Sequence, residues 1–444
     1  MQDKIKMVYS WIGPKGPVWN TELPNILSFS SVAEGVQPDS RHFWCEGTWH
    51  TLCANRQHLF EAYPAFGITE DDTRPFIVPF SLTWRIAFTH YFCGRTGILE
   101  FAHLPWHLVR LVRDSNGYIL IDHSVEAFMS DQELKAMHGY FSGIHALPLN
   151  KIMYLTGTIN AVEVYNDFCE RHGIPDSPDE RLTVIPYPSS LDIFSRYVEQ
   201  GTDEPVYNTG VVPEKLFLMW NRRYRRHRVE LTLALENKNL IDRSYVSFSD
   251  VDIENPSMSF SDSVDEDYLV HINYGLDITP DDIARFKSKL PLVIDGETDV
   301  TRMCEDFDNA ARPYFQNSLV SIVTETNWDA SEITLTEKSF KPIKEKHPFI
   351  IVGVKGVLKG MRDLGFKTFS DFWDESYDDI DCPQQRLVAI AAICEEIGSW
   401  SPEKILDFRR KVSPILTHNW NLLSRPVSDV TVNVICDHIR RTIK

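Results

Sequence analysis

The sequence predicts an α/β protein of two domains, each built on a mostly parallel sheet and facing the other across a cleft. Short apolar runs alternate with amphipathic helical patterns, which is typical of parallel strands covered on both faces. This rhythm stops once, in the polar stretch 201–214 with its two glycines and two prolines, and then restarts. The 444 residues, 43% of them hydrophobic, exceed what one ordinary core accommodates.

The N-terminal domain, residues 1–200, carries the first set of strands. Helical patterns separate them, and apolar runs predict the strands at 4–12, 76–80, 118–122, 152–156 and 182–186. We expect helices at 125–140 and 160–172. The first strand is followed by the loop "GPKGPVWN", in which Gly13 and Gly16 allow the backbone to approach a ligand closely. We expect Gly13, Lys15 and Gly16 to form an acceptor or phosphate loop.

The C-terminal domain, residues 215–425, repeats the pattern beyond the linker. Apolar runs predict a second set of strands at 215–220, 245–249, 290–294, 319–323 and 348–353. A helical pattern runs from 402 to 444, and its last part, 426–444, could cross back to the N-terminal domain. Open parallel sheets bind ligands at the carboxyl ends of their strands, so we expect the ligand in the cleft between two such sheets.

Composition excludes several classes of protein. A net charge of −18 argues against general binding to the phosphate backbone of nucleic acid. Eight cysteines without paired spacing indicate buried thiols in a reducing compartment, and they disfavour a zinc site. The segment "MQDKIKMVYSWIG" does not resemble a signal peptide, and no window reaches the roughly 18–20 apolar residues of a membrane span. We therefore expect a soluble cytoplasmic protein, and its oligomeric state is not predicted.

A basic cluster follows the first strand of the C-terminal domain. The stretch "LFLMWNRRYRRHRVELTLALE" leads from an apolar run into a helix at 227–238, and between them lie Arg222, Arg223, Arg225, Arg226 and Arg228. Helix N-termini attract anions through their backbone N–H groups and dipole, and guanidinium forks add to this. The alternative is a solvated basic face, but the dipole there favours acids, so the cations indicate a phosphate site.

A carboxylate and an ammonium lie side by side in "ITLTEKSFKPIKEKHPFIIVG". If Thr336 caps the helix, Pro342 lies beyond its first turn and costs a hydrogen bond. If Ser339 is the cap, Glu337 and Lys338 lie in the preceding loop. Both alternatives place the pair at the strand ends. There the glutamate could accept hydrogen bonds from two vicinal hydroxyls, as on a ribose, and the lysine could neutralise a phosphate.

This arrangement resembles the donor-binding half of GT-B glycosyltransferases, in particular the α-1,3-fucosyltransferase-like group. That group has an apolar strand, a Glu-Asn-Ser-like turn, Thr-Glu-Lys at the start of a helix, and another apolar strand. Here the strand is 319–323, the turn is Thr324-Glu325-Thr326, and Thr-Glu-Lys stands at 336–338 before "PFIIVG". Thr326 departs from the asparagine of the family. The resemblance covers roughly 215–380 of this chain.

The resemblance implies two Rossmann-like domains and a nucleotide-sugar donor in the C-terminal one. Glu337 would meet the ribose, Lys338 the donor phosphates, and an arginine of the basic cluster the diphosphate. Glu325 would join this donor set through its place in the turn. Cationic side chains would stabilise the departing diphosphate, so no metal or other cofactor is expected. The overall sequence is similar to transferases common in phage and bacterial genomes. It therefore implies a surface glycan or a hydroxymethylated base of phage DNA as acceptor, and the host cytoplasm if phage-encoded.

The acceptor side is expected in the N-terminal domain. The stretch "LIDHSVEAF" places Asp122, His123 and Glu126 after a strand, where one of them could take the acceptor proton. Alternatively, Asp122 or Ser124 caps the helix expected at 125–140. The stretch "HFWCEGTWH" at 42–50, which holds His42, Glu46 and His50, could stack a sugar or base, although aromatic core packing is the stronger interpretation.

Two further functions stay open. Asp250-Val251-Asp252 is a DxD motif after a strand, and Asp306-Phe307-Asp308 is another. Hard carboxylates of this kind hold a divalent ion in metal-dependent, GT-A-like transferases. With 63 acidic residues, such motifs also arise by chance. The other alternative is a nucleotide-binding protein without catalytic activity.

Overall fold

The computed structural model divides the chain into two compact units. It describes residues 5–9, 11–13, 16–18, 60–64, 74–81, 106–124, 129–199, 203–221, 225–250, 260, 264, 275–294, 311–425, 433, 436–441 and 443. Unit 1 comprises Met1–Asp192 and Pro426–Lys444, and unit 2 comprises Ile193–Arg425. Each unit has its own parallel sheet, which confirms the predicted α/β class with two Rossmann-like units.

The sheet of unit 1 is parallel throughout its described strands. Its order is β4-β1-β5-β6-β7-β8. The strands are β1 (Ile5–Tyr9), β4 (Phe60–Pro64), β5 (Phe76–Ser81), β6 (Gly117–His123), β7 (Ile152–Thr156) and β8 (Thr183–Pro186). All five residues of β7 are buried, as a continuous apolar run in a parallel sheet predicts. A short antiparallel hairpin, β2 (Trp11–Gly13) and β3 (Gly16–Val18), follows β1.

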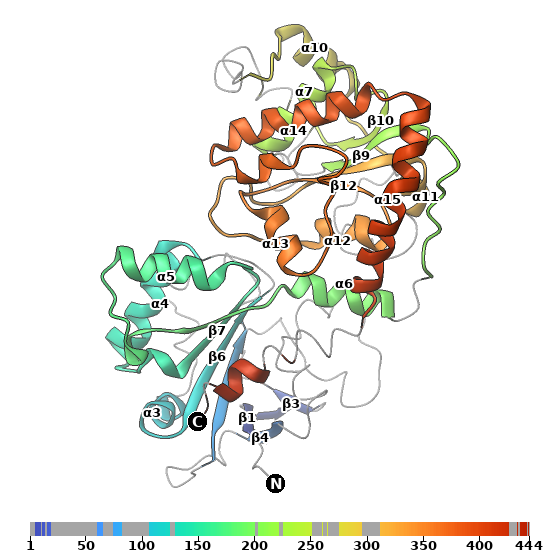
Figure 1. The fold of residues 1–444 in the computed structure, drawn as a ribbon. Helices are drawn as coiled ribbons and strands as arrows, with labels where there is room; N and C mark the ends of the chain where they lie inside the picture. Colours follow the sequence, from blue (N-terminus) through green and yellow to red (C-terminus); the bar gives the residue numbers. More distant parts are fainter. Residues whose placement is uncertain are drawn as a thin grey trace. The chain divides into compact units, whose positions relative to one another are not determined.

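Three helices lie beside this sheet (Figure 1): α3 (Trp106–Asp114), α4 (Asp131–His138) and α5 (Ala161–Arg171). The next helix, α6 (Ser189–Glu199), contains the boundary between the units, and its Phe194 packs against Phe340 of unit 2. A π-helical turn, Gly139–Ile144, follows α4, and short 3-10 turns lie at Leu149–Lys151 and Pro178–Glu180. The core buries large side chains from both layers, among them Phe76, Ile121, Phe141, Tyr154 and Phe168.

The helix expected at 125–140 is shorter than predicted. It begins at Asp131, because the Ser130 hydroxyl accepts from the backbone N–H of Glu133 while the Glu133 carboxylate accepts from the backbone of Ser130. Neither Asp122 nor Ser124 caps this helix, so that hypothesis is wrong. The serine–glutamate spacing of this capping box was visible in "SDQE".

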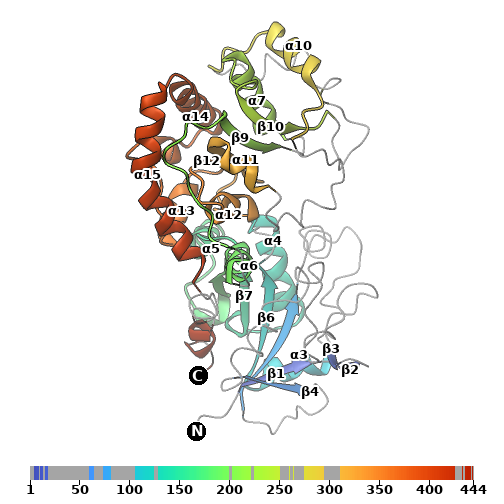
Figure 2. The ribbon, with the colours of Figure 1, turned by 90° about the vertical axis from the view of Figure 1, so that its right-hand side faces the viewer.

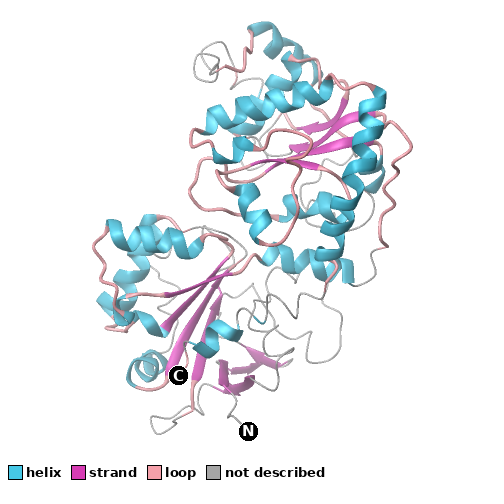
Figure 3. Cartoon of the chain, in the orientation of Figure 1, coloured by secondary structure: helices cyan, strands magenta, loops and turns pink. Residues whose placement is uncertain are grey.

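The sheet of unit 2 has the order β10-β9-β11-β12 and is also parallel. Its strands are β9 (Lys215–Asn221), β10 (Ser244–Phe248), β11 (Ser318–Thr324) and β12 (Phe349–Val352). Helices cover both faces, and Figure 3 shows the strands between them. The helices are α7 (Arg226–Asn237), α10 (Pro280–Lys289), α11 (Arg312–Gln316), α12 (Glu337–Lys344), α13 (Val357–Asp363), α14 (Pro383–Gly398) and α15 (Pro402–Leu423), with a 3-10 turn at Ser376–Asp379.

Two predicted elements of this half are corrected. Residues 290–294 form no strand: Leu292 alone pairs, in an isolated antiparallel bridge with Phe248. Pro291 has no N–H to donate to a neighbouring strand, which limits pairing there. The helical tail is also interrupted, because α15 ends at Leu423 and helix is described again only at 433 and 436–441. Pro426 follows the end of α15, as is common beyond a helix C-terminus.

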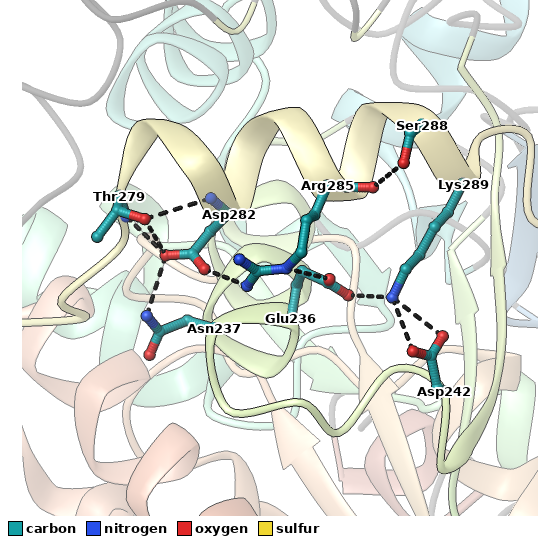
Figure 4. Close-up of polar contacts among 8 residues, drawn as sticks. All are labelled: Glu236, Asn237, Asp242, Thr279, Asp282, Arg285, Ser288 and Lys289. Carbon is teal, nitrogen blue, oxygen red and sulfur yellow. Dashed lines mark hydrogen bonds and ion pairs between the residues drawn. The ribbon is translucent and has the colours of Figure 1, made fainter.

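A polar network holds α10 against α7, and the two helices lie side by side in both views (Figures 1 and 2). Figure 4 shows its centre, the Glu236 carboxylate near the end of α7. Glu236 is 2% exposed and accepts from Arg285 Nε at 3.1 Å and Lys289 Nζ at 2.9 Å. Thr279 caps α10, and the Asp282 carboxylate accepts from the Thr279 N–H at 2.8 Å and from the Asn237 amide at 3.0 Å. These contacts hold the C-terminal end of α7 against α10.

Candidate functional site

The order of strands in unit 2 marks one place on its sheet edge. From β9 the chain moves to β10 on one side, and then to β11 on the other side of β9. The carboxyl ends of β9 and β11 therefore flank the point where the winding reverses. In open parallel sheets this reversal leaves a crevice in which ligands bind. The residues at these two strand ends are Asn221, Thr324 and Glu325.

The Glu325 carboxylate, just after β11, organises the loop that follows. It is 1% exposed and accepts four hydrogen bonds. Oε1 accepts from the Thr336 N–H at 3.0 Å and the Ser339 hydroxyl at 2.6 Å. Oε2 accepts from the Thr336 hydroxyl at 2.6 Å and the Thr326 N–H at 3.3 Å. Both oxygens are thus occupied by the chain itself.

The structure decides between the two caps considered for α12. Thr336 is the N-cap, with its hydroxyl accepting from the Lys338 N–H at 3.3 Å, and Pro342 lies inside the helix. Glu337 and Lys338 therefore stand in the first helical turn, next to the carboxyl end of β11. Lys338 Nζ donates to the Glu337 carboxylate at 2.6 Å and to the Thr336 hydroxyl at 3.3 Å.

Charge is balanced closely at this pair. Burial alone raises the pKa of Glu337, but the charges of Lys338 and Lys341 outweigh it and lower that pKa to about 2. The carboxylate is therefore ionised at any physiological pH. Both side chains are about a quarter exposed, at 28% for Glu337 and 25% for Lys338, so a ligand can reach them.

The N-terminus of α7 meets the same strand end. Arg228 Nη2 donates to the Thr324 carbonyl at 3.1 Å, and the buried His227 ring contacts the Glu325 carbonyl through Nε2 at 2.9 Å. Burial first, and then the Arg228 charge, lower the pKa of His227 to about 3, so the ring is neutral. The N-cap residue is Arg225, an arginine with no acceptor to offer, and the first turn has no acid.

The five predicted arginines are thus placed in four ways, and Arg225 is the N-cap of α7. Arg228 is buried at 3% exposure and lies at the end of β11, close to the Thr-Glu-Lys turn. Arg226 pairs with the buried Glu230 at 2.5 Å. Arg222 and Arg223 lie outside the described residues. The structure therefore brings at least Arg228 together with Lys338 and Glu337, all around Thr324 and Glu325.

Sequence reasoning missed several residues of this site. The Asn221 amide is 1% exposed at the end of β9, and its Oδ1 accepts from the Thr324 hydroxyl at 2.5 Å. Trp328 stacks on His227, with ring centroids 5.4 Å apart. Arg386 of α14 donates to the Trp328 carbonyl and to the Gly353 carbonyl, which ties the loops after β11 and β12 together. Only Asn221 had a sequence signal, because a polar residue ends its apolar run.

The sheet edge of unit 1 has its own reversal. The chain goes from β1 to β4 on one side and then to β5 on the other. The hairpin that follows β1 pairs Gly13 with Gly16, so these two glycines close its turn, and Lys15 lies outside the described residues. The next strand along, β6, pairs with β5 and ends in Asp122 and His123.

Asp122 and His123 are both buried, at 3% and 0% exposure. Asp122 Oδ1 accepts from the Ser124 N–H at 3.0 Å and from the Ser124 hydroxyl at 2.6 Å. The His123 Nδ1 lies 2.8 Å from the Tyr154 hydroxyl. Glu126, the third candidate, lies outside the described residues. The strand next to the reversal therefore ends in a buried carboxylate and a buried imidazole.

The metal hypothesis rests on residues that the structure covers only in part. Asp250 is described, and its carbonyl accepts from the Phe260 N–H at 2.6 Å. Asp252, Asp306 and Asp308 lie outside the described residues. The stretch considered for stacking a sugar or base, with His42, Glu46 and His50, also lies outside them. Within the described ranges, no cluster of three histidine, cysteine or acidic side chains is arranged to hold a metal. Within the same ranges, no helix is both long and apolar enough to cross a bilayer.

Comparison with solved structures finds similarity in fold to three proteins, among others. No protein-family model matches the sequence, and neither does a curated protein. The chain is similar to a UDP-forming α,α-trehalose-phosphate synthase from Burkholderia xenovorans, with a TM-score of 0.42 and 13% identity over 92% of this chain and 81% of that one. It is similar to an α,α-trehalose 6-phosphate synthase from Burkholderia multivorans, with a TM-score of 0.43 and 14% identity over 99% of each chain.

A third likeness is to a glycosyltransferase from Rickettsia africae ESF-5, with a TM-score of 0.32 and 12% identity over 88% of each chain. All three TM-scores are below 0.5.

Proposed function

We propose that the protein is a cytoplasmic glycosyltransferase that moves a sugar from a nucleotide-sugar donor to a hydroxyl acceptor. The observation that carries this proposal is the meeting of two helix N-termini, those of α7 and α12, at the carboxyl end of β11. Arg228, His227 and Thr336 all make hydrogen bonds to residues 324–325. Such a place favours a diphosphate, because helix N-termini and cationic side chains add their fields there.

Lys338 and Glu337 would contact different parts of the donor, the lysine its phosphates and the glutamate its ribose. The Lys338 ammonium has three N–H donors, and two go to Glu337 and Thr336. The third is available to a phosphate oxygen. The Glu337 carboxylate, ionised because its pKa is about 2, can accept from the hydroxyls of a ribose. The resemblance to the α-1,3-fucosyltransferase-like group supports the same assignment.

The chemistry that this arrangement would perform needs no metal. When the sugar leaves, negative charge grows on the diphosphate, and fixed cations at a helix N-terminus stabilise such charge. Arg228 and Lys338 would supply this positive charge. Arg225 and Arg226, at the N-cap and first residue of α7, would add to it. In the acceptor domain Asp122, or His123 or Glu126 in its place, would take the proton of the attacking hydroxyl.

We further propose that the acceptor is a bacterial surface glycan or a hydroxymethylated base of phage DNA. The phage-like character of the sequence supports the second choice. The net charge of −18 counts against DNA unless basic side chains gather locally. Incubation with a labelled donor and each acceptor in turn decides between them.

A thermal-shift screen of nucleotide sugars and nucleoside diphosphates tests the proposed function. A ligand at a hundred times its Kd stabilises the folded state by about 2.7 kcal/mol, which is readily detected as a rise in Tm. The expected result is a rise with one family of nucleotides. No shift with any of them would refute the proposal. Binding without sugar transfer or donor hydrolysis would instead indicate a non-catalytic nucleotide-binding protein.

The metal-dependent alternative has a separate test. Treatment with EDTA should leave sugar transfer largely intact if cationic side chains hold the diphosphate. Loss of activity in EDTA, restored by Mn²⁺, would favour a transferase that uses Asp250 and Asp252.

A further inference from the structure

We propose that Glu325 is a positioning residue: it orients the Thr336 hydroxyl, and through it the Lys338 ammonium, toward the phosphates of the donor. This inference rests on the proposed function, and it changes the role that resemblance gave to Glu325. The carboxylate does not contact the donor but sets the direction of a hydrogen-bond relay inside the protein.

The relay has three members in contact. The Thr336 hydroxyl lies 2.6 Å from Glu325 Oε2 and 3.3 Å from Lys338 Nζ. A carboxylate and an ammonium differ in what they allow a hydroxyl to do, since the first only accepts and the second only donates. The single hydroxyl proton of Thr336 must therefore point to Glu325, and its lone pairs face the N–H and the ammonium of Lys338.

An amide in place of the carboxylate would not set this direction. Four donors reach the two oxygens of Glu325, namely two backbone N–H groups and the hydroxyls of Thr336 and Ser339. Glutamine presents one accepting oxygen, and its NH₂ group would face two of these donors. In a site with 1% exposure, water cannot repair that mismatch. The chain therefore needs glutamate here for its acceptors.

The consequence for Lys338 is orientation. Its ammonium is held by Thr336 on one side and by Glu337 on another, which leaves one N–H in a fixed direction at the start of α12. Groups that act on charge in a reaction work best when they are already in place. Three of the bonds to Glu325, from the Thr336 N–H and the hydroxyls of Thr336 and Ser339, join the two ends of the loop 325–336, so Glu325 holds both the loop and the relay to the ammonium.

The test measures the affinity of the purified 444-residue chain for UDP, GDP, ADP and inorganic pyrophosphate by calorimetry. Glu325→Gln should weaken binding of whichever probe the wild type takes by at least about tenfold, the loss expected when one charge-assisted hydrogen bond is misdirected. In a Lys338→Met background the same change should add less than about twofold, because the two residues act on one contact. The matched control is Glu332→Gln, which changes a buried carboxylate of the same loop bonded to Ser331 and should leave affinity unchanged.

A second pair of variants guards against misfolding of Glu325→Gln. Thr336→Val keeps the volume and removes the relay, and it should reproduce the loss of affinity. Thr336→Ser keeps the hydroxyl and should restore it. Equal affinity of Glu325→Gln and wild type, or a full additional loss in the Lys338→Met background, would overturn the positioning role while leaving the proposed function standing. A wild type that binds none of the four probes would overturn both.

Discussion

Replacing Lys338 by methionine tests the donor site most directly, because it removes one charge and keeps most of the side-chain volume. The lost contact is a charge-assisted hydrogen bond to a diphosphate, worth about 1.5–3 kcal/mol, or roughly a 10- to 150-fold rise in Kd. The neighbouring Glu337 pushes the effect toward the upper end. Its carboxylate, 2.6 Å from the ammonium, would lose that partner and repel the phosphates.

The same change should cost little stability. The Lys338–Glu337 pair is about a quarter exposed on both sides, and such pairs contribute at most about 1 kcal/mol. The assay measures the Kd for nucleoside diphosphate by titration calorimetry, and Tm is measured in parallel. Lys359→Met is the control, because Lys359 is 62% exposed and pairs with Asp363 on α13. An unchanged Kd in Lys338→Met would show that this lysine does not hold the donor.

Three further predictions concern the acceptor side, the α10 network and pH. Asp122→Asn keeps the Oδ1 that accepts from Ser124, so Tm should hold while kcat falls by about 10² to 10⁴ and donor Kd stays constant; a loss of Tm with kcat unchanged would make the residue structural. Arg285→Met or Lys289→Met alone should cost about 1 kcal/mol in urea unfolding, but the double variant clearly more than the sum, because the buried Glu236 then has neither partner; additive losses would contradict this. The pKa of His227 is lowered from 6.5 to about 3, so the folded state resists protonation of this ring and the free energy of unfolding falls as pH drops from 6.5 toward 3. The expected loss is about 2 kcal/mol between pH 7 and 5. His227→Gln should flatten that part of the pH profile of stability, and an unchanged slope would refute the assignment.

The parallel sheets were predictable because their signal is local. Each buried strand needs a short apolar run, and β6, β7, β9, β11 and β12 fall within about two residues of the runs that predicted them. Other segments differ from the prediction: 4–12 divides into β1 and β2; β4 was not predicted; and 290–294 has the same apolar content, but Pro291 lacks a backbone donor. Composition alone does not distinguish such a segment from a strand.

Helix starts were harder to predict because they depend on which polar side chain reaches the backbone. "LTEKSFKPI" offered both Thr336 and Ser339 as caps. Glu325, eleven residues before Thr336, accepts from the hydroxyls of both, but it also accepts from the backbone N–H of Thr336. The backbone N–H of Ser339 instead donates to the Thr336 carbonyl, so Ser339 lies in the first turn and Thr336 caps the helix. No local pattern contains that information.

The sequence by itself determined the α/β class, most strands of the two sheets, the basic residues after β9 and the Thr-Glu-Lys segment, since all of these follow from residue types within one short segment. Only the tertiary structure shows that Arg228 and Lys338, 110 positions apart, lie at the same edge of the sheet. It also shows that the Glu325 carboxylate accepts its hydrogen bonds from Thr326, Thr336 and Ser339 of the same chain. The physical reason is the strand order, which places β11 beside β9 and so brings their carboxyl ends together.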